Sequence, residues 1–487
     1  MTPISFACTD AGSGGGDAVT DGVGEGVVAG RGAPVGADAR GAAARLQAAA
    51  TAPTADKPPA SSMRRVSTAC NSTAVRRSKT AAWVTLFLLL LAFAILVVVT
   101  TPWHPLSGSV PGGHVRPDVH RDFTAAQIAH ETRYHDTIRP WGLTGLVLGL
   151  LVPVVLGFTP IGRRIIDRFG RLHWLLQVTL GVALVVVLTT LVTLPIAARE
   201  HAIETDYGLT TQGWGGWATD QLRGLAVAFV STWIGIAVVV AIARRFTRSY
   251  WAPAAVLAAG LVFAGSFAYP YIVEPLFNSF HSLPAGTLRD DLLALARSDH
   301  QPLHDILVAN ASRRTTTENA YVSGFGASRR LVLYDTLLAQ DTPGEIRVIT
   351  AHELGHAKYD DVLHGTIEGA LVVAAAMCAL FLLVGARAAQ PRYVPLLLAL
   401  YAVVGFAVSP LTNVISRHIE ARADAHALQL THDPVDYVNA QKRLALAGLD
   451  DLKPSPVLYA LFFNHPSPIQ RLAMARDWAR QHHAPEP

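Results

Sequence analysis

The chain has 487 residues, of which 51% are apolar and only 16% are charged, and its formal net charge is +4. Soluble domains carry about 25% charged residues, so this composition excludes an ordinary soluble protein. The small net charge gives no argument for a nucleic-acid partner, and we expect none. The three cysteines (Cys8, Cys70 and Cys378) form no metal-binding spacing, so a bound metal would need His and carboxylate ligands.

The first part of the chain, residues 1 to about 62, consists largely of Gly, Ala, Asp and Thr. Such a stretch cannot bury enough apolar surface to offset the entropy lost on ordering. We therefore predict a disordered Ala/Gly-rich tail and assign residues 1–80 to it. No apolar core follows Met1, so a signal peptide is not expected.

Seven apolar runs follow, each near the length of about 20 residues that crosses a bilayer as a helix. They are Ala82–Pro102, Leu143–Pro160, Trp174–Ala197, Leu225–Ala243, Pro253–Ile272, Gly369–Ala386 and Val394–Val408. The alternative, buried helices of a large soluble protein, fits least well at Leu86–Val99, which has no polar side chain. We predict five transmembrane helices in residues 81–274 and two more in 366–412. The Ala/Arg/Gly-rich usage suggests a bacterial host, and hence a multi-pass protein of the plasma membrane.

Basic residues are unevenly distributed between the loops. They precede the first span and gather between the second and third spans and between the fourth and fifth. The positive-inside rule then places the N-terminus in the cytoplasm and residues 275–365 on the outer side.

The polar region 275–365 is predicted to be the first part of a small mixed domain, which residues 413–487 complete. It contains one short helix, Leu288–Ala296, and three β-rich segments, Asp305–Val308, Asn319–Val322 and Arg330–Tyr334. Thr342 and Glu345 have the spacing of a capping box, with a proline between them at the first helical position. A further helix is therefore expected to begin here.

That helix carries the sequence Ala351-His352-Glu353-Leu354-Gly355-His356. Residues four apart share a helix face, so the two imidazoles point to one place, where they can bind zinc. Glu353 lies beside them and can take a proton from a water activated by the metal. Gly355 leaves room for close approach of a substrate or another backbone. Chance occurrence of this pattern on an amphipathic helix is the alternative.

A second cluster follows the last predicted span. Catalytic zinc uses three protein ligands and keeps one position open. Glu420 and Asp424 are also four residues apart; Glu420 can be the third ligand, and Asp424 can accept the remaining N–H of a ligating His. The alternative is a solvated helix in which Glu420 pairs with Arg417 or Arg422.

Two more segments have candidate roles in catalysis. His465 precedes a proline and can donate to a developing oxyanion, while Arg471 can add positive charge there. The segment Asn319-Ala320-Tyr321 belongs to a predicted strand whose edge can bind an extended peptide substrate. The alternatives are a surface histidine and a simple turn at Asn319.

Together, the motifs HELGH, SRxxExxAD, NAYVSGFG…RRLVLYDTLL and NHPSPIQRL resemble the type I CaaX prenyl endopeptidases and their bacterial HtpX-like relatives. The resemblance covers roughly residues 200–487. It implies His352, His356 and Glu420 as zinc ligands, and Glu353 as the catalytic base. It also implies Asp424 as the partner of a ligand, His465 and Arg471 as transition-state donors, and Asn319 as a contact to substrate backbone. In this family the catalytic domain usually faces the cytosol, opposite to the side that the arginine distribution predicts.

The predicted fold is an all-α multi-pass membrane bundle of about seven helices with a small α+β gluzincin-type metalloprotease domain. The predicted function is zinc-dependent hydrolysis of peptide bonds in membrane-associated proteins or peptides, with one Zn²⁺ per chain. Its partners are then protein or peptide substrates and membrane lipid. One alternative is CaaX-type processing of lipidated peptides. Others are a zinc-containing membrane transporter or scaffold without catalysis, and a receptor in which the HExxH pattern is accidental.

Overall fold

The computed structural model describes residues 60–105, 113–301, 303 and 305–487. The predicted tail lies outside the described residues as far as position 59. Its last part is helical instead: α1 (Ala60–Thr100) begins well before the predicted boundary at residue 81. The segment contains neither Gly nor Pro, so nothing in it interrupts a helix that the apolar span continues. Residues Arg77–Pro487 form one compact unit.

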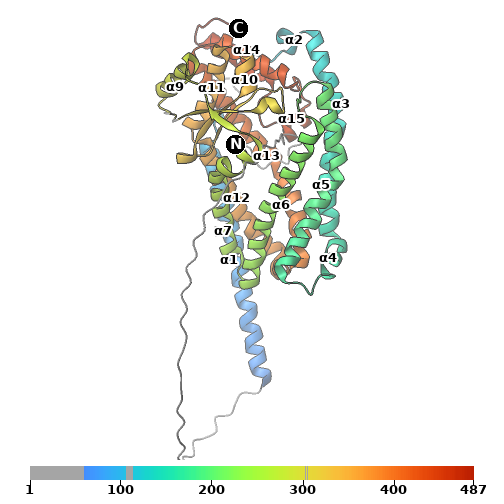
Figure 1. The fold of residues 1–487 in the computed structure, drawn as a ribbon. Helices are drawn as coiled ribbons and strands as arrows, with labels where there is room; N and C mark the ends of the chain where they lie inside the picture. The colour runs from blue at the N-terminus through green and yellow to red at the C-terminus, as the bar shows by residue number, and fades with distance from the viewer. Residues whose placement is uncertain (1–59, 106–112, 302, 304) are drawn as a thin grey trace, which may run out of the picture. The chain divides into compact units, whose positions relative to one another are not determined.

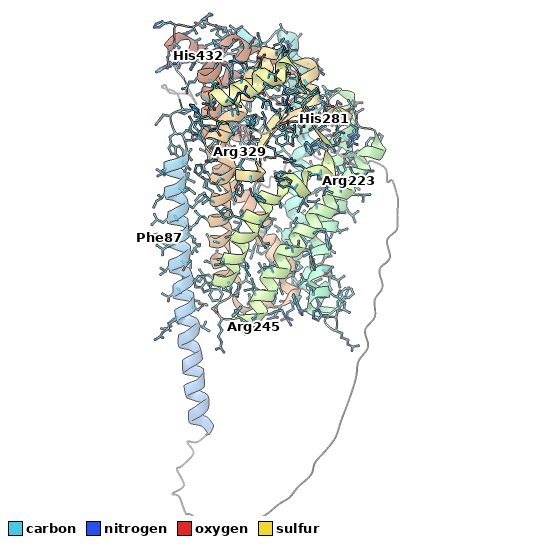
Figure 2. All side chains as sticks on the ribbon, turned by 60° about the vertical axis from the view of Figure 1, so that its left-hand side comes forward. Phe87, Arg223, Arg245, His281, Arg329 and His432 are labelled. Carbon is cyan, nitrogen blue, oxygen red and sulfur yellow. The ribbon has the colours of Figure 1, made fainter. Side chains whose placement is uncertain are left out.

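Seven helices of the described residues are long and apolar enough to cross a membrane. They are α1, α3 (Ala125–Phe158), α5 (Trp174–Asp206), α6 (Trp214–Arg245), α7 (Trp251–Ile272), α12 (Asp361–Val384) and α13 (Val394–Thr431). Each predicted apolar run falls on one of them. Several large apolar side chains on these helices are exposed, including Val256 at 71% and Phe87 at 65%. Figure 2 shows Phe87 pointing away from the bundle. Such a surface suits lipid, and the protein is a multi-pass membrane protein.

The bundle is held by helix pairs that pack along their length: α3 against α5 and α13, α5 against α6, and α7 against α12. Its core contains Val178, Val182, Val240, Phe381 and Val394. Prolines lie inside several of these helices (Pro140, Pro153, Pro195, Pro270 and Pro410). Membrane helices tolerate them because neighbouring groups satisfy the freed carbonyls.

The last transmembrane helix differs from the prediction. The predicted span ended at Val408 and the predicted boundary with the small domain lay at residue 412, but the span and the segment that carries Glu420 form one continuous helix, α13. Pro410 lies within it without ending it. A rigid element thus runs from the membrane to the candidate site.

The small domain contains a four-stranded sheet with the order β1-β2-β4-β3. The strands are β1 (Phe280–Ser282), β2 (Ile306–Ala309), β3 (Ala320–Ser323) and β4 (Arg330–Tyr334). β2 and β4 are parallel, and the other two pairs are antiparallel. The three predicted strands are confirmed to within a residue or so, whereas β1, only three residues long, was not predicted. β3 lies at the edge of the sheet.

Helices surround this sheet and complete the domain. The longer ones are α9 (Thr287–Ser298), α11 (Pro343–Lys358), α14 (Pro434–Ala447) and α16 (Pro468–Gln481). Shorter segments, some in this domain and others at the far end of the bundle, are α2 (Val119–Asp122), α4 (Pro160–Asp167), α8 (Glu274–Phe277), α10 (Asp335–Gln340), α15 (Pro456–Phe462), η1 (Ala311–Arg313), η2 (Gly326–Ser328), η3 (Gly385–Ala389) and η4 (Pro391–Tyr393). Figure 1 shows α14 and the sheet at one end of the bundle and α4 at the other. The predicted fold class is confirmed.

Candidate metal centre

The helix α11 is held in place by a cap at its start and by the packing of the HELGH motif against α13. At its start, the Thr342 hydroxyl accepts the Glu345 N–H and the Glu345 carboxylate accepts the Thr342 N–H, which is the predicted capping box. Further along, Ala351 and Leu354 are fully buried in a core shared with α13. At Gly355, α11 lies close to α13, because a Cβ there would be 3.2 Å from the Ala423 Cα. Of the two reasons expected for this glycine, the structure supports the close approach of another backbone, that of α13.

The helix turn of α11 brings the two histidines of the motif together. The imidazole rings of His352 and His356 have centroids 4.9 Å apart, and their Nε2 atoms are 3.2 Å apart. Glu420 approaches from α13, with its Oε2 3.2 Å from His352 Nε2 and 3.6 Å from His356 Nε2. These three residues form a cluster that could hold a metal ion.

The spacing of the three atoms fits a small divalent ion. A tetrahedral zinc with ligands at about 2.0–2.1 Å separates neighbouring ligand atoms by roughly 3.3 Å. The observed separations of 3.2, 3.2 and 3.6 Å lie around that value. Two imidazoles and one carboxylate are also a donor set that leaves one tetrahedral position for water or substrate.

A carboxylate stands behind each histidine. His352 Nδ1 lies 2.9 Å from Asp424 Oδ1, and His356 Nδ1 lies 2.9 Å from Asp361 Oδ2. The His356–Asp361 hydrogen bond places the ring proton on Nδ1 and leaves the Nε2 lone pair directed at the cluster, and the close contact with Asp424 favours the same tautomer of His352. The partner role expected for Asp424 agrees with this contact. Asp361 was not predicted; it is the first residue of α12, reached after a left-handed Asp360.

The electrostatics of the cluster favour a cation. Burial by itself lowers the pKa of His356, but the Glu420 and Asp361 carboxylates outweigh it and raise the pKa to about 10. Burial likewise lowers the pKa of His352, while Asp424 and Glu420 raise it, and the net direction is upward. Negative charge therefore exceeds positive charge around the imidazoles, and a divalent ion bound between them compensates it.

Two arginines hold the supporting carboxylates. The Arg471 Nε donates to Asp424 Oδ2 at 2.9 Å, and the same guanidinium also donates to Oδ1. Arg422 pairs with Asp361 and lies 4.1 Å above the Tyr359 ring. Burial lowers the pKa of Arg471, but Asp424 outweighs this and raises it. Arg471, expected at the oxyanion, thus contacts the carboxylate behind His352.

Glu353, which directly follows the first histidine of the motif, faces the sheet. The Glu353 carboxylate is buried, and its Oε2 accepts the Val322 backbone N–H at 3.0 Å. Val322 belongs to the edge strand β3 and pairs with Leu331 of β4. Because alternate residues of a strand direct their backbone groups to opposite sides, Ala320 and Val322 share the free edge. The edge strand and Glu353 are therefore in direct contact.

The remaining predicted residues lie around this centre at different depths. His465 Nε2 is 3.2 Å from Glu420 Oε2, and the side chain is half exposed. Asn319 is exposed, and its backbone carbonyl accepts the Tyr334 backbone N–H at 2.9 Å. The Tyr321 hydroxyl donates to Glu274 at 3.3 Å, so it is directed toward that carboxylate.

The comparisons with known proteins agree with this arrangement. Residues 282–479 match peptidase family M48, and residues 142–279 match the CAAX prenyl protease N-terminal region of five membrane helices. The chain is 32% identical over 315 residues to "Uncharacterized metalloprotease YhfN" of Bacillus subtilis, covering 61% of this chain and 72% of the relative. It is 32% identical over 238 residues to a "CAAX prenyl protease 1 homolog" of Oryza sativa. That match covers 45% of this chain and 55% of the relative, so the chain spans about half the length of that relative.

A solved structure shares the fold. The crystal structure of S. mikatae Ste24p superposes with a TM-score of 0.64 at 20% sequence identity, and the match covers 81% of this chain and 98% of that one. The predicted resemblance is confirmed, and with it a metallopeptidase that acts on peptide or protein substrates. This chain belongs to peptidase family M48.

Proposed function

We propose that the protein is a zinc-dependent endopeptidase that hydrolyses peptide bonds in membrane-associated proteins or peptides. The observation that carries the proposal is the convergence of two imidazole nitrogens and one carboxylate oxygen, 3.2–3.6 Å apart, beside a buried glutamate at a sheet edge. His352, His356 and Glu420 would hold one Zn²⁺. This donor set is the one that catalytic zinc uses in several peptidases.

The chemistry divides between the ion and the chain. When bound, zinc polarises the scissile carbonyl and makes water a stronger acid at neutral pH. Glu353 takes the proton of the attacking water and passes it to the leaving amine. His465, half exposed beside Glu420, donates a hydrogen bond to the oxyanion. Arg471 and Asp424 keep His352 in the required tautomer.

The substrate would bind as an additional strand. β3 is an edge strand, and the N–H of Val322 reaches Glu353, so a peptide paired with this edge passes the base. Backbone pairing of this kind tolerates many side chains, which suits the removal of varied membrane proteins. Asn319, exposed just before β3, would bind substrate backbone beside Ala320 and Tyr321.

A paired measurement tests the proposal. Detergent-purified wild type and Glu353→Gln are assayed for zinc per chain and for cleavage of an unfolded reporter protein. Both should hold about one zinc, while the variant loses about 10²–10⁴-fold in cleavage rate, because only the base is removed. Glu486→Gln, an exposed carboxylate, is the matched control.

Each other outcome has a definite meaning. Equal cleavage by wild type and Glu353→Gln would assign the activity to a contaminating protease. Zinc in both without any cleavage that depends on Glu353 would favour the scaffold or transporter alternative. Absence of zinc from both would contradict the ligand assignment itself.

A second candidate function is favoured by the relatives named CAAX prenyl protease 1 homolog. They suggest that this chain processes lipidated peptides. A farnesylated peptide and its unmodified form, compared at equal concentration, distinguish the two: preferential cleavage of the farnesylated form by about tenfold or more supports lipid recognition.

We also propose a place and an orientation for the protein. The arginine-rich loops lie at the end of the bundle opposite the metal centre. The positive-inside rule then puts that end in the cytoplasm of a bacterial cell and the metal centre on the outer side. A C-terminal reporter that is active only in the cytoplasm should be inactive when fused after Pro487; an active fusion would reverse the orientation.

A further inference from the structure

A cavity of about 150 Å³ lies at the end of the bundle away from the metal centre. It is formed where α3 ends, α4 begins, and η4 leads into α13. Its wall is close-packed: a Cβ on Gly157 would lie 2.4 Å from the Ala399 Cβ, so the backbone of α3 lies directly against α13. The cavity is thus part of the packed bundle and not a gap between loose loops.

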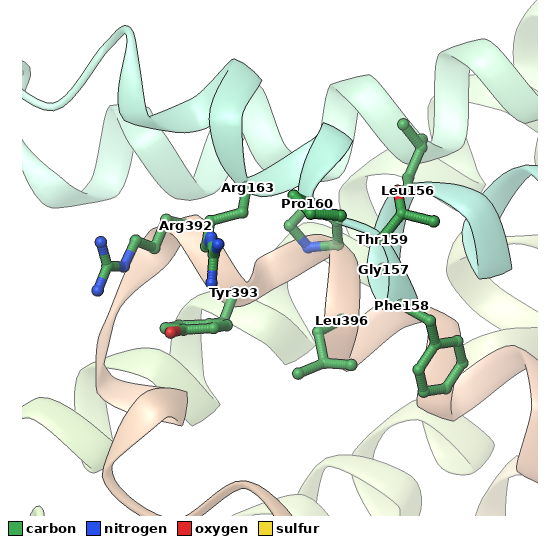
Figure 3. A pocket seen from close by; sticks show the side chains of 10 residues that line it. Leu156, Gly157, Phe158, Thr159, Pro160, Arg163, Arg392, Tyr393 and Leu396 are labelled. Atoms are coloured by element: carbon green, nitrogen blue, oxygen red, sulfur yellow. The ribbon is translucent and has the colours of Figure 1, made fainter.

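The lining is amphipathic. Figure 3 shows Arg163, Arg392 and Tyr393 at one end of the cavity, and Leu396 and Phe158 at the other. Phe158 is 54% exposed, as a side chain that faces lipid would be. A ligand that matches both ends carries a negative charge next to an apolar chain.

The two arginines of the cavity have guanidinium N–H groups available for an anion. Arg392 donates its Nε to Gln390 Oε1 at 3.0 Å, which leaves its terminal nitrogens. Arg163 is exposed and makes no ion pair within the described part of the chain. Arg392 is 3.8 Å from Asp167, a loose contact in which both side chains are more than 40% exposed. Pairs of that kind contribute little, so Asp167 offsets only part of the positive charge. A phosphate group can accept hydrogen bonds from both guanidinium groups.

The loops next to the cavity carry further positive charge. Between Thr159 and His173 the chain has four arginines and the single acidic residue Asp167, and Arg387 and Arg392 follow in the loop before α13. Exposed apolar side chains, among them Phe169 and Leu172, lie in the same segment. Arginines next to exposed aromatic and aliphatic groups are typical of the membrane–water interface.

From these observations we propose that the cavity binds the headgroup phosphate of an anionic phospholipid. Arg163 and Arg392 contact the phosphate, Tyr393 contributes its hydroxyl, and the acyl chains lie along Phe158 and Leu396. The ligand is a lipid of the leaflet that faces the arginine-rich loops. This inference does not depend on the peptidase chemistry, which occurs at the other end of the bundle.

Native mass spectrometry of the full-length protein in neutral detergent tests the site. Phosphatidylglycerol and phosphatidylcholine are offered separately, and inorganic phosphate is added in a third arm. Wild type should retain phosphatidylglycerol in preference to phosphatidylcholine. Arg163→Gln and Arg392→Gln should each weaken phosphatidylglycerol binding about fivefold, the effect of one basic residue at an anionic lipid surface.

Matched variants separate a defined site from general charge. Arg248→Gln removes an exposed arginine from the loop between α6 and α7, outside the cavity, and should leave binding unchanged. Leu396→Trp fills the cavity without changing its charge and should also weaken binding. If Arg392→Gln fails to fold, Arg163→Gln still tests whether the cavity binds phosphatidylglycerol, because this change breaks no ion pair among the described residues.

Three results would overturn the proposal. An equal loss in Arg248→Gln would mean that lipid binds to diffuse charge. Equal retention of both lipids by every variant would mean that the cavity is not used. Displacement of phosphatidylglycerol by an equal concentration of inorganic phosphate would identify a site for free phosphate.

Discussion

The two ends of the bundle use arginine in opposite ways. At the metal centre, Arg471 and Arg422 are largely buried, and each is paired with a carboxylate that holds a histidine. At the far end, Arg163 is exposed and Arg392 is half-buried, and the acidic contact of Arg392 with Asp167 is loose. A buried charge without its partner is costly, so the first pair fixes geometry. An exposed charge is easily satisfied by water, so the second pair is free to meet a ligand or a lipid surface.

The largest expected effect is loss of the third metal ligand. Glu420→Ala should lower the bound metal well below one per chain and reduce peptide cleavage by about 10³-fold or more, because two imidazoles alone bind zinc weakly. Metal analysis and a reporter cleavage assay measure both. Glu486→Ala is the control. Full metal content in Glu420→Ala would mean that another residue completes the site.

The contrast between the two ends can be tested as a difference in stability. Arg422→Gln removes the only charged donor that the described residues give the buried Asp361 carboxylate, which keeps the His356 imidazole, and should destabilise the protein by about 3 kcal/mol. Arg163→Gln should change stability by less than about 0.5 kcal/mol. Thermal unfolding in the same detergent compares the variants directly. Similar shifts for both would show that exposure does not separate the two groups of arginines.

The unpredicted carboxylate gives a smaller effect on metal binding. Asp361→Asn removes the charge behind His356 and should weaken zinc affinity about 10–100-fold, as loss of a histidine partner does elsewhere. Its neighbour Asp360→Asn is the control, since Asp360 is exposed and Asn also adopts its left-handed backbone. Chelator competition measures the affinities. An equal loss of zinc affinity in both variants would mean that the affinity depends on the overall negative charge near the site and not on the contact between Asp361 and His356.

The smallest effect is a pH dependence near the sheet edge. Burial and the neighbouring Asp341 raise the pKa of Glu318 from 4.5 to about 7. The folded protein therefore keeps this proton where the unfolded chain has lost it, so the stabilisation is full below about pH 4.5 and is lost as the pH rises through 7. Glu318→Gln should remove that loss and be more stable than wild type by about 1–2 kcal/mol above pH 7.

Unfolding curves across this range check the sign. The difference between Glu318→Gln and wild type should increase as the pH rises from 4.5 to 7 and stay constant above. A difference that does not vary with pH would show that the pKa of Glu318 is the same in the folded and the unfolded protein.

Much of this structure follows from local patterns in the sequence. Apolar length predicted all seven spans, and the four-residue spacings of His352 with His356 and of Glu420 with Asp424 predicted which side chains converge. Contacts that depend on how the chain turns between two helices could not be predicted from the spacing of residues. Asp361 reaches His356 only because Asp360 is left-handed between α11 and α12, and spacing gives no sign of that turn.

The extent of α13 was missed for a related reason. Pro410 normally signals the end of a helix, but inside a membrane the alternative to helix is an unsatisfied backbone. For Arg471, sequence gives the charge but not the partner, and its role at the oxyanion stays a prediction. The structure supplies that partner, Asp424.

The unbroken length of α13 also works as a molecular ruler. Leu411 is the last large apolar side chain of this helix that is exposed, and Glu420 follows nine residues later, about 14 Å along the axis. An extended peptide covers that height with about four residues. Substrates anchored in the bilayer should therefore be cut no closer than about four residues from their membrane segment. A series of anchored peptides with spacers of increasing length would show the threshold, and uniform cleavage at every length would exclude it.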